Sequence, residues 1–136
     1  MIKDIYNQRA APYFYDPEIK NYRIDLDEFE KMVEKDVEDG LIPFWFGASY
    51  GTTFSVAIDI EPRLIDICKK HGMWINLDCA FLGSGWMCPH LRPKDPAILE
   101  AVDSLQINFS KVQFTGMGSS LAFYAQKKWI SESFGQ

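Results

Sequence analysis

The sequence is short of cysteine, of long hydrophobic runs and of positive charge, and each shortage excludes a class of protein. Its three cysteines, Cys68, Cys79 and Cys88, are an odd set at spacings that match no disulfide framework, which favours free thiols in a reducing compartment. The longest apolar run, 41–46, is far too short to span a bilayer. With 14 Lys and Arg against 19 Asp and Glu, the net charge is −5. The negatively charged phosphate backbone of nucleic acids repels a protein of this charge. We therefore expect a cytoplasmic protein that binds neither membranes nor nucleic acid.

The length and composition predict a single globular domain. The chain has 136 residues, of which 47% are hydrophobic and 24% charged, so it is unlike a disordered tail, a collagen-like repeat or a coiled coil. Residues 1–24 are rich in Tyr, Pro and Asn and lack a sustained period, and Pro12 and Pro17 mark turns. We expect 1–24 to be a lead-in segment and 25–136 to form the domain.

A zinc site is one interpretation of the sulfur and imidazole side chains. Cys79, Cys88 and His90, with His71 as a fourth ligand, are the residues that would form it. The chain has no Cys-x-x-Cys pair, which is the usual source of tight local geometry in such sites. The sequence therefore favours buried or partly buried thiols and no metal.

The first regular element that the sequence predicts is a helix over 26–39. Asp25 is followed three residues later by Glu28, which is typical of a capping box at a helix start. Gly40 follows the expected last turn, where glycine commonly ends a helix. Four apolar residues share one face of this helix: Leu26, Phe29, Val33 and Val37.

Strands and helices then alternate along the chain. We expect strands at 42–48, 73–77, 103–109 and 120–125. The first of these should have Pro43 at its start. It is apolar throughout, so we expect it to be buried on both faces. A helix over 60–71, with Asp59 as its cap, and a short helix ending at Ala101 lie between the strands. The connections between these strands are long enough to cross from one strand to the start of a parallel neighbour. The pattern therefore predicts an α/β fold with a mainly parallel sheet and flanking helices.

Polar residues follow three of the predicted strands. Thr53 comes after the first, Asp78 directly after the second, and Asn108 and Lys111 after the third. Taken singly, each is more often a turn former, a helix cap or a solvated side chain. Because the carboxyl ends of parallel strands meet at one edge of a sheet, we expect these side chains to share a rim. A carboxylate that keeps a pyridine nitrogen protonated, beside a lysine that forms a Schiff base, is what pyridoxal phosphate requires.

The order and spacing of several blocks between 22 and 128 resemble the pyridoxal-phosphate-dependent group II decarboxylases, and among these the decarboxylases of aromatic amino acids. The blocks that carry the resemblance are 40–44, 51–53, 76–84, 88–92 and 103–108 with Lys111. The resemblance implies part of the large domain of a fold-type I pyridoxal phosphate enzyme. It also implies a small amino-acid substrate, loss of the α-carboxylate as carbon dioxide, and a homodimeric assembly.

The resemblance also implies roles for individual residues. Lys111 matches the lysine that bonds covalently to the cofactor, and Asp78 matches the aspartate that pairs with the pyridine nitrogen. Ala80 matches the small residue against one face of the cofactor ring. Thr53 matches a threonine near cofactor and substrate, and Asn108 an asparagine on the phosphate side.

The chain departs from the family pattern at three positions. Ser110 and Asn76 stand where the family has histidine, and Cys79 stands where alanine is usual. Family members are several times longer, so we expect this chain to be the middle of the large domain and to be inactive alone. The alternatives are a truncated, non-catalytic paralogue that binds a full-length partner, and an independent α/β module whose polar rim is structural.

Overall fold

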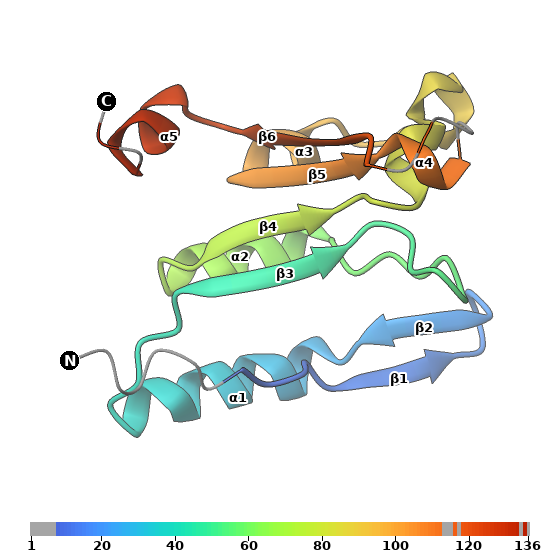
Figure 1. Ribbon diagram of the computed structural model, residues 1–136. Coiled ribbons are helices and arrows are strands. Elements are labelled where there is room, and N and C mark those ends of the chain that lie inside the picture. Colours follow the sequence, from blue (N-terminus) through green and yellow to red (C-terminus); the bar gives the residue numbers. More distant parts are fainter. Residues whose placement is uncertain (1–7, 113–115, 117, 134, 136) are drawn as a thin grey trace.

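The computed structural model describes residues 8–112, 116, 118–133 and 135 (Figure 1). In chain order its elements are β1 (Tyr13–Asp16), β2 (Asn21–Ile24), α1 (Leu26–Glu38), β3 (Trp45–Ser49), α2 (Pro62–Lys70), β4 (Trp74–Asp78), α3 (Ala97–Ala101), β5 (Ser104–Asn108), α4 (Phe109–Val112), β6 (Ser120–Tyr124) and α5 (Lys127–Ser133). Two short 3₁₀ helices, Leu82–Met87 and Pro89–Leu91, lie between β4 and α3. Among these described segments, no helix has the length and apolar composition of a membrane span.

The central sheet has the strand order β3-β4-β5-β6. Strands β3, β4 and β5 are parallel, and β6 runs antiparallel to β5. Asp78 at the end of β4 lies opposite Ser49 of β3 and Gln106 of β5. The mainly parallel α/β sheet predicted from the alternation of elements is therefore confirmed, and each predicted strand overlaps an observed one.

Helix α1 begins and ends where its sequence signals predict. The side chain of Asp25 accepts a hydrogen bond from the backbone N–H of Glu28 at 3.1 Å, which satisfies one of the donors left free at a helix start. Gly40 follows the helix with φ +80°, a conformation that other residues rarely adopt. The predicted apolar face is buried as far as Val33, whereas Val37 in the last turn is exposed.

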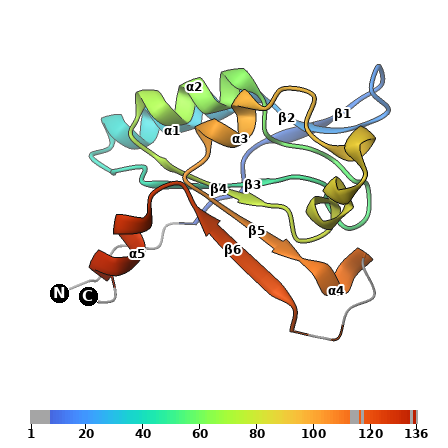
Figure 2. The same ribbon diagram turned by 90° about the horizontal axis from the view of Figure 1, so that it is seen from above.

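Helices α1, α2 and α3 cover one face of the sheet, and most of the other face is open, with α5 at one end of it (Figure 2). Along β3 the covered face carries the buried Phe46 and Ala48, whereas Trp45 is 47% exposed on the open face. The expectation that this strand is buried on both faces is wrong, because α1, α2 and α3 all lie on the covered face. On the open face, Trp129 of α5 packs against Trp74 of β4, with ring centroids 4.6 Å apart. Pro43 lies before the strand instead of at its first position.

Part of the lead-in segment has regular structure that the sequence did not indicate. Strands β1 and β2 form an antiparallel hairpin, in which Phe14 lies opposite Arg23. The carboxylate of Asp16 accepts hydrogen bonds from the Glu18 N–H at 2.8 Å and from Arg23 at 3.1 Å, and the first of these contributes most to lowering its pKa. Strands of four residues are too short to show a period, so composition alone suggested turns.

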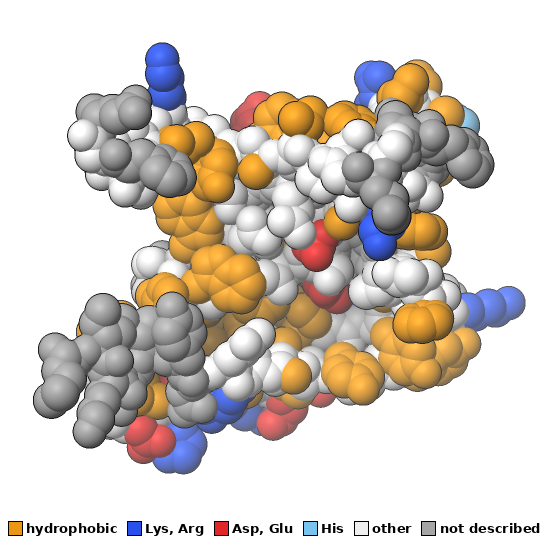
Figure 3. Space-filling view, viewed as in Figure 1, with side chains coloured by type: hydrophobic (Ala, Val, Ile, Leu, Met, Phe, Trp, Pro, Cys, Tyr) orange, Lys and Arg blue, Asp and Glu red, His pale blue; other side chains and the backbone are white. Residues whose placement is uncertain are grey.

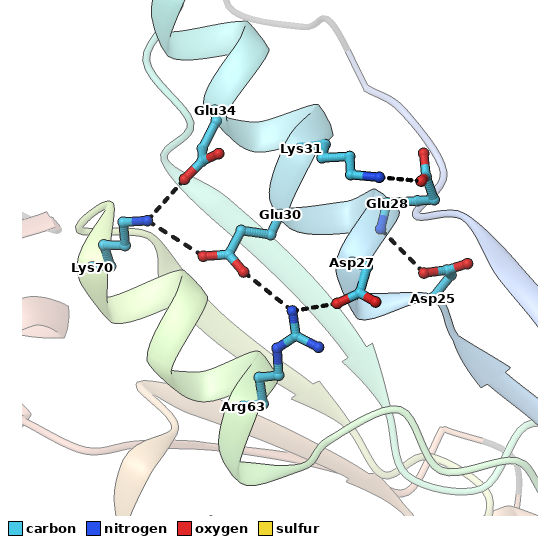
Figure 4. Close-up of polar contacts among 8 residues, drawn as sticks. All are labelled: Asp25, Asp27, Glu28, Glu30, Lys31, Glu34, Arg63 and Lys70. Carbon is cyan, nitrogen blue, oxygen red and sulfur yellow. Dashed lines mark hydrogen bonds and ion pairs between the residues drawn. The ribbon is translucent and has the colours of Figure 1, made fainter.

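An ion-pair network joins α1 to α2 on the outer surface (Figure 4). Arg63 on α2 pairs with Asp27 and Glu30 of α1, and Lys70 pairs with Glu30 at 3.3 Å and with Glu34 at 2.9 Å. The hydrogen bond from Arg63, followed by that from Lys70, lowers the pKa of Glu30. Because such exposed pairs are solvated, they orient the two helices more than they stabilise the fold.

The buried face of α2 is the main source of its attachment to the sheet. Leu64 on this face is fully buried, whereas Ile42 is 83% exposed. We expect Leu64→Ala to lower the free energy of unfolding by about 2–5 kcal/mol, because it leaves a cavity. The matched change Ile42→Ala should alter it by less than about 0.5 kcal/mol. Urea denaturation of both variants measures this difference, and similar midpoints for the two would contradict the observed packing.

Candidate functional site

Polar residues lie at the carboxyl ends of three parallel strands, at the same edge of the sheet. Asp78 is the last residue of β4 and Asn108 the last of β5, and the arrowheads of β3, β4 and β5 point the same way in Figure 1. The hydrogen bonding continues past the strand ends: the Tyr50 N–H donates to Asp78 O at 2.8 Å, and the Cys79 N–H donates to Gln106 O at 2.9 Å. The loops that follow the strands therefore start side by side.

Asp78 lies on the open face of the sheet, at its carboxyl edge. Its neighbours Leu77 and Cys79 are fully buried, so the alternation along β4 places the half-buried Asp78 on the other side. One carboxylate oxygen, Oδ1, accepts the backbone N–H of Ala80 at 2.9 Å. The other, Oδ2, has no hydrogen-bond partner among the described residues. The carboxylate is therefore anchored at one oxygen and available at the other.

Lys111 is exposed on the single turn of α4, which begins directly after β5. This turn is held by Asn108, whose Oδ1 accepts the Ser110 N–H at 3.0 Å and also the Ser110 hydroxyl. Ser110, one of the departures from the family pattern, thus helps to close the turn that carries Lys111. The amide nitrogen of Asn108 has no partner in the described part of the chain.

Thr53 lies in the loop that follows β3, and it is exposed. The loop is closed by its neighbour Thr52, whose hydroxyl oxygen accepts the Ala57 N–H at 3.0 Å and bonds to the Ser55 hydroxyl at 2.9 Å. The Thr52 hydroxyl therefore makes its hydrogen bonds within the loop. The Thr53 hydroxyl has no hydrogen-bond partner among the described residues, so it remains available to a ligand.

Asp59 does not cap α2 as the sequence suggested. The N-cap residue of α2 is Glu61, and its side chain makes no capping hydrogen bond. Asp59 lies two residues before this position. The carboxylate of Asp59 instead accepts the Ser49 N–H at 2.9 Å, so it ties the loop after β3 back to the strand. Burial is the largest influence on this carboxyl group and raises its pKa.

A row of polar side chains on the open face was missed by sequence reasoning. The indole Nε1 of Trp74 donates to the Ser104 hydroxyl at 2.9 Å, and that hydroxyl donates to Asn76 Oδ1 at 2.8 Å. Residues 74, 76 and 78 alternate along β4, which was the signal available in the sequence. In Figure 3, which views this face, hydrophobic side chains gather over the amino-terminal parts of β3 and β4, and acidic side chains are exposed nearer their carboxyl ends.

The sulfur side chains do not gather into a metal site. Cys79 is fully buried and Cys88 is exposed, and no group of three or more His, Cys, Asp or Glu side chains within the described residues could hold a metal ion. Burial raises the pKa of both Cys68 and Cys79 to about 12. Although Cys79 follows Asp78 directly, its thiol is turned into the core.

In α/β sheets, ligands bind at the carboxyl ends of the parallel strands, and Asp78 and Lys111 lie at this edge. The pyridoxal-dependent decarboxylase conserved domain matches residues 17–135 of this sequence. The chain belongs to the pyridoxal-dependent decarboxylase family. The resemblance seen in the sequence blocks and the fold class expected from it are both confirmed.

Individual relatives differ in the reaction that their names describe. The chain is 33% identical over 115 residues to the aromatic-L-amino-acid decarboxylase of Drosophila melanogaster, covering 85% of this chain and 22% of that protein. It is 36% identical over 101 residues to the phenylacetaldehyde synthase of Arabidopsis thaliana, covering 74% and 20%. The crystal structure of Oryza sativa TDC with PLP and tryptamine superposes with a TM-score of 0.71 at 25% identity, covering 81% and 22%. The chain thus spans about a fifth of the length of these relatives.

The burial of two thiols predicts selective alkylation. At pH 8 we expect iodoacetamide to modify Cys88 in the folded chain and to leave Cys68 and Cys79 intact, because only the thiolate reacts and these two thiols stay protonated below about pH 12. Peptide mass spectrometry measures the three sites, and denaturation in urea supplies the fully modified control. Equal modification of Cys79 and Cys88 in the native chain would show that Cys79 is not buried.

Proposed function

We propose that this chain carries the cofactor-binding residues for pyridoxal-phosphate-dependent decarboxylation of an aromatic L-amino acid, a carboxy-lyase reaction. The observation that carries the proposal is the joint position of Asp78 and Lys111. Asp78 ends one of two adjacent parallel strands and Lys111 follows the other, and both lie inside the region matched by the family. The names of the relatives, which include decarboxylases of aromatic amino acids, support the substrate class.

The side chains at this edge suit pyridoxal phosphate chemically. The free oxygen of Asp78 is an acceptor for the protonated ring nitrogen, and the exposed amine of Lys111 is a nucleophile for the aldehyde. Ala80 has a small side chain, which would leave room for a flat ring beside Asp78. The amide nitrogen of Asn108 and the hydroxyl of Thr53 are donors for phosphate or carboxylate oxygens. The donor and acceptor types present therefore fit the group.

The protein's contribution to the reaction is to hold and orient charge. Bound pyridoxal phosphate supplies an electron sink for the electron pair that is left when carbon dioxide departs. Asp78, anchored through Ala80, would hold the ring nitrogen and favour its protonated form. Lys111 would hold the cofactor covalently through its amine, and the free amine would move a proton to or from the substrate.

Compartment, assembly and domain limits are also part of this proposal. We place the protein in the cytoplasm, which the three free cysteines support. We propose that it acts in a homodimer, as the family resemblance implies, and that 25–136 is the cofactor-binding domain. The buried cluster that α1, α2 and the strands share supports a single unit, and this cluster also includes Ile24 just before that range.

A non-catalytic role, in which the chain binds a full-length relative, is the alternative function. The observation that favours it is the open sheet face, where Trp45 and Tyr124 are 47% and 46% exposed. A large exposed apolar face often marks an interaction surface. Copurification with a full-length decarboxylase, without any pyridoxal phosphate bond at Lys111, would favour this alternative.

Capture of the cofactor at Lys111 is the first test. Incubation with pyridoxal phosphate, borohydride reduction and peptide mapping should yield a modified peptide that contains Lys111. The change Lys111→Ala should abolish this signal because it removes the nucleophile. A matched control is Lys128→Ala on α5, which follows β6 at the opposite end of the parallel strands and should leave labelling at Lys111 unchanged. Labelling spread evenly over exposed lysines would overturn the assignment.

Turnover by the 136-residue chain on its own should be negligible. Capture needs only an accessible amine, whereas catalysis needs a rigidly aligned cofactor, and a small misplacement costs about a hundredfold in rate. Because the sheet face above Asp78 is open, a ring bound there would be solvated on one side. We expect release of labelled carbon dioxide from dopa or 5-hydroxytryptophan to equal that of a Lys111→Ala control. Release clearly above that control, in a preparation free of full-length enzyme, would refute this expectation.

A further inference from the structure

Two neighbouring side chains on the open face of β4 each have one end anchored and one end available. Asp78 is held through Oδ1 by the Ala80 N–H at 2.9 Å, and Asn76 is held through Oδ1 by the Ser104 hydroxyl at 2.8 Å. Neither Asp78 Oδ2 nor the Asn76 amide nitrogen has a hydrogen-bond partner among the described residues. Side chains two residues apart on a strand share a face and are about 6.6 Å apart.

The hydrogen-bond chain behind Asn76 fixes which end of its amide is available. The indole of Trp74 can only donate, so it occupies a lone pair of the Ser104 hydroxyl oxygen at 2.9 Å. Ser104 is buried, with 8% exposure, and its hydroxyl hydrogen needs an acceptor because an unpaired buried donor is costly. Asn76 Oδ1 is that acceptor, so the amide NH₂ is the group left for a ligand.

We propose that Asn76 and Asp78 recognise one edge of a pyridine ring together, with Asn76 as a further cofactor-binding residue. This inference rests on the proposed function and adds the residue that selects the ring oxygen. Asp78 accepts from the ring N–H, and the Asn76 amide donates to the oxygen on ring carbon 3. In pyridoxal these two groups flank ring carbon 2 on the same side of the ring, so one acceptor and one donor along β4 complement them.

The complementarity is specific to an oxygen at that ring position. An amide N–H beside a ring oxygen that carries negative charge makes a charge-assisted hydrogen bond, which is stronger than a neutral one. A ring without the oxygen leaves the amide without a partner. The role of Asn76 is therefore discrimination between hydroxylated and unsubstituted pyridines, and it requires no covalent bond at Lys111.

The test uses two small probes that differ only in the hydroxyl group, namely 3-hydroxypyridine and pyridine. Each is titrated into the 136-residue chain, and the side-chain amide signals of Asn76 are followed by NMR. We expect 3-hydroxypyridine to shift these signals and to bind about three- to tenfold more tightly than pyridine. Asn76→Leu should remove the preference, and Ser104→Ala should weaken it because the amide is no longer held.

Gln106→Leu is the matched control, because Gln106 lies opposite Asp78 on the same face and is exposed. It should retain the preference. Equal binding of the two probes to the unaltered chain would overturn the inference, as would a preference that persists in Asn76→Leu. Shifts confined to residues away from Asn76 would overturn it too. If the preference holds while Lys111 captures no pyridoxal phosphate, the proposed function fails and the recognition by Asn76 stands.

Discussion

The parallel, in-register pairing of β3, β4 and β5 is the constraint on which the rest of the site depends. It brings Ser49, Asp78 and Gln106 into line, so that every loop carrying a candidate residue starts from the same edge. A shift of one residue in β4 would turn Asp78 into the core and Leu77 outward. Burial of Ile75 and Leu77 beneath α2 therefore fixes both the sheet and the position of the carboxylate.

Short local hydrogen bonds then position the polar groups on this edge. Asp78 is held by the Ala80 N–H, the turn carrying Lys111 is closed by Asn108 and Ser110, and the loop carrying Thr53 is closed by Thr52. Each bond joins residues at most five positions apart, so it depends only on the local chain around it. The site is thus assembled from local turns on a rigid parallel scaffold, which is a favourable way to preorganise charge.

The sequence predicted the sheet and its helices because their signals are local and strong. The capping of α1 by Asp25, the glycine after it and the apolar strands all appear within a few residues of the elements they define. Four features escaped prediction for physical reasons. The β1–β2 hairpin is too short to show a period, Asp59 pairs with a strand ten residues back, and the open face of β3 depends on which helices pack elsewhere. The hydrogen bonds from Trp74 through Ser104 to Asn76 join two strands and are visible only once β4 and β5 are paired.

The central claim is that one flat cofactor ring is held between the carboxylate of Asp78 and the amine of Lys111. A crystal structure of the chain grown with pyridoxal phosphate tests this most directly. The account predicts continuous electron density from Lys111 Nζ to the cofactor and a hydrogen bond of about 2.8 Å between the ring nitrogen and Asp78. Cofactor bound to another lysine, or a ring nitrogen that faces solvent away from Asp78, would contradict it.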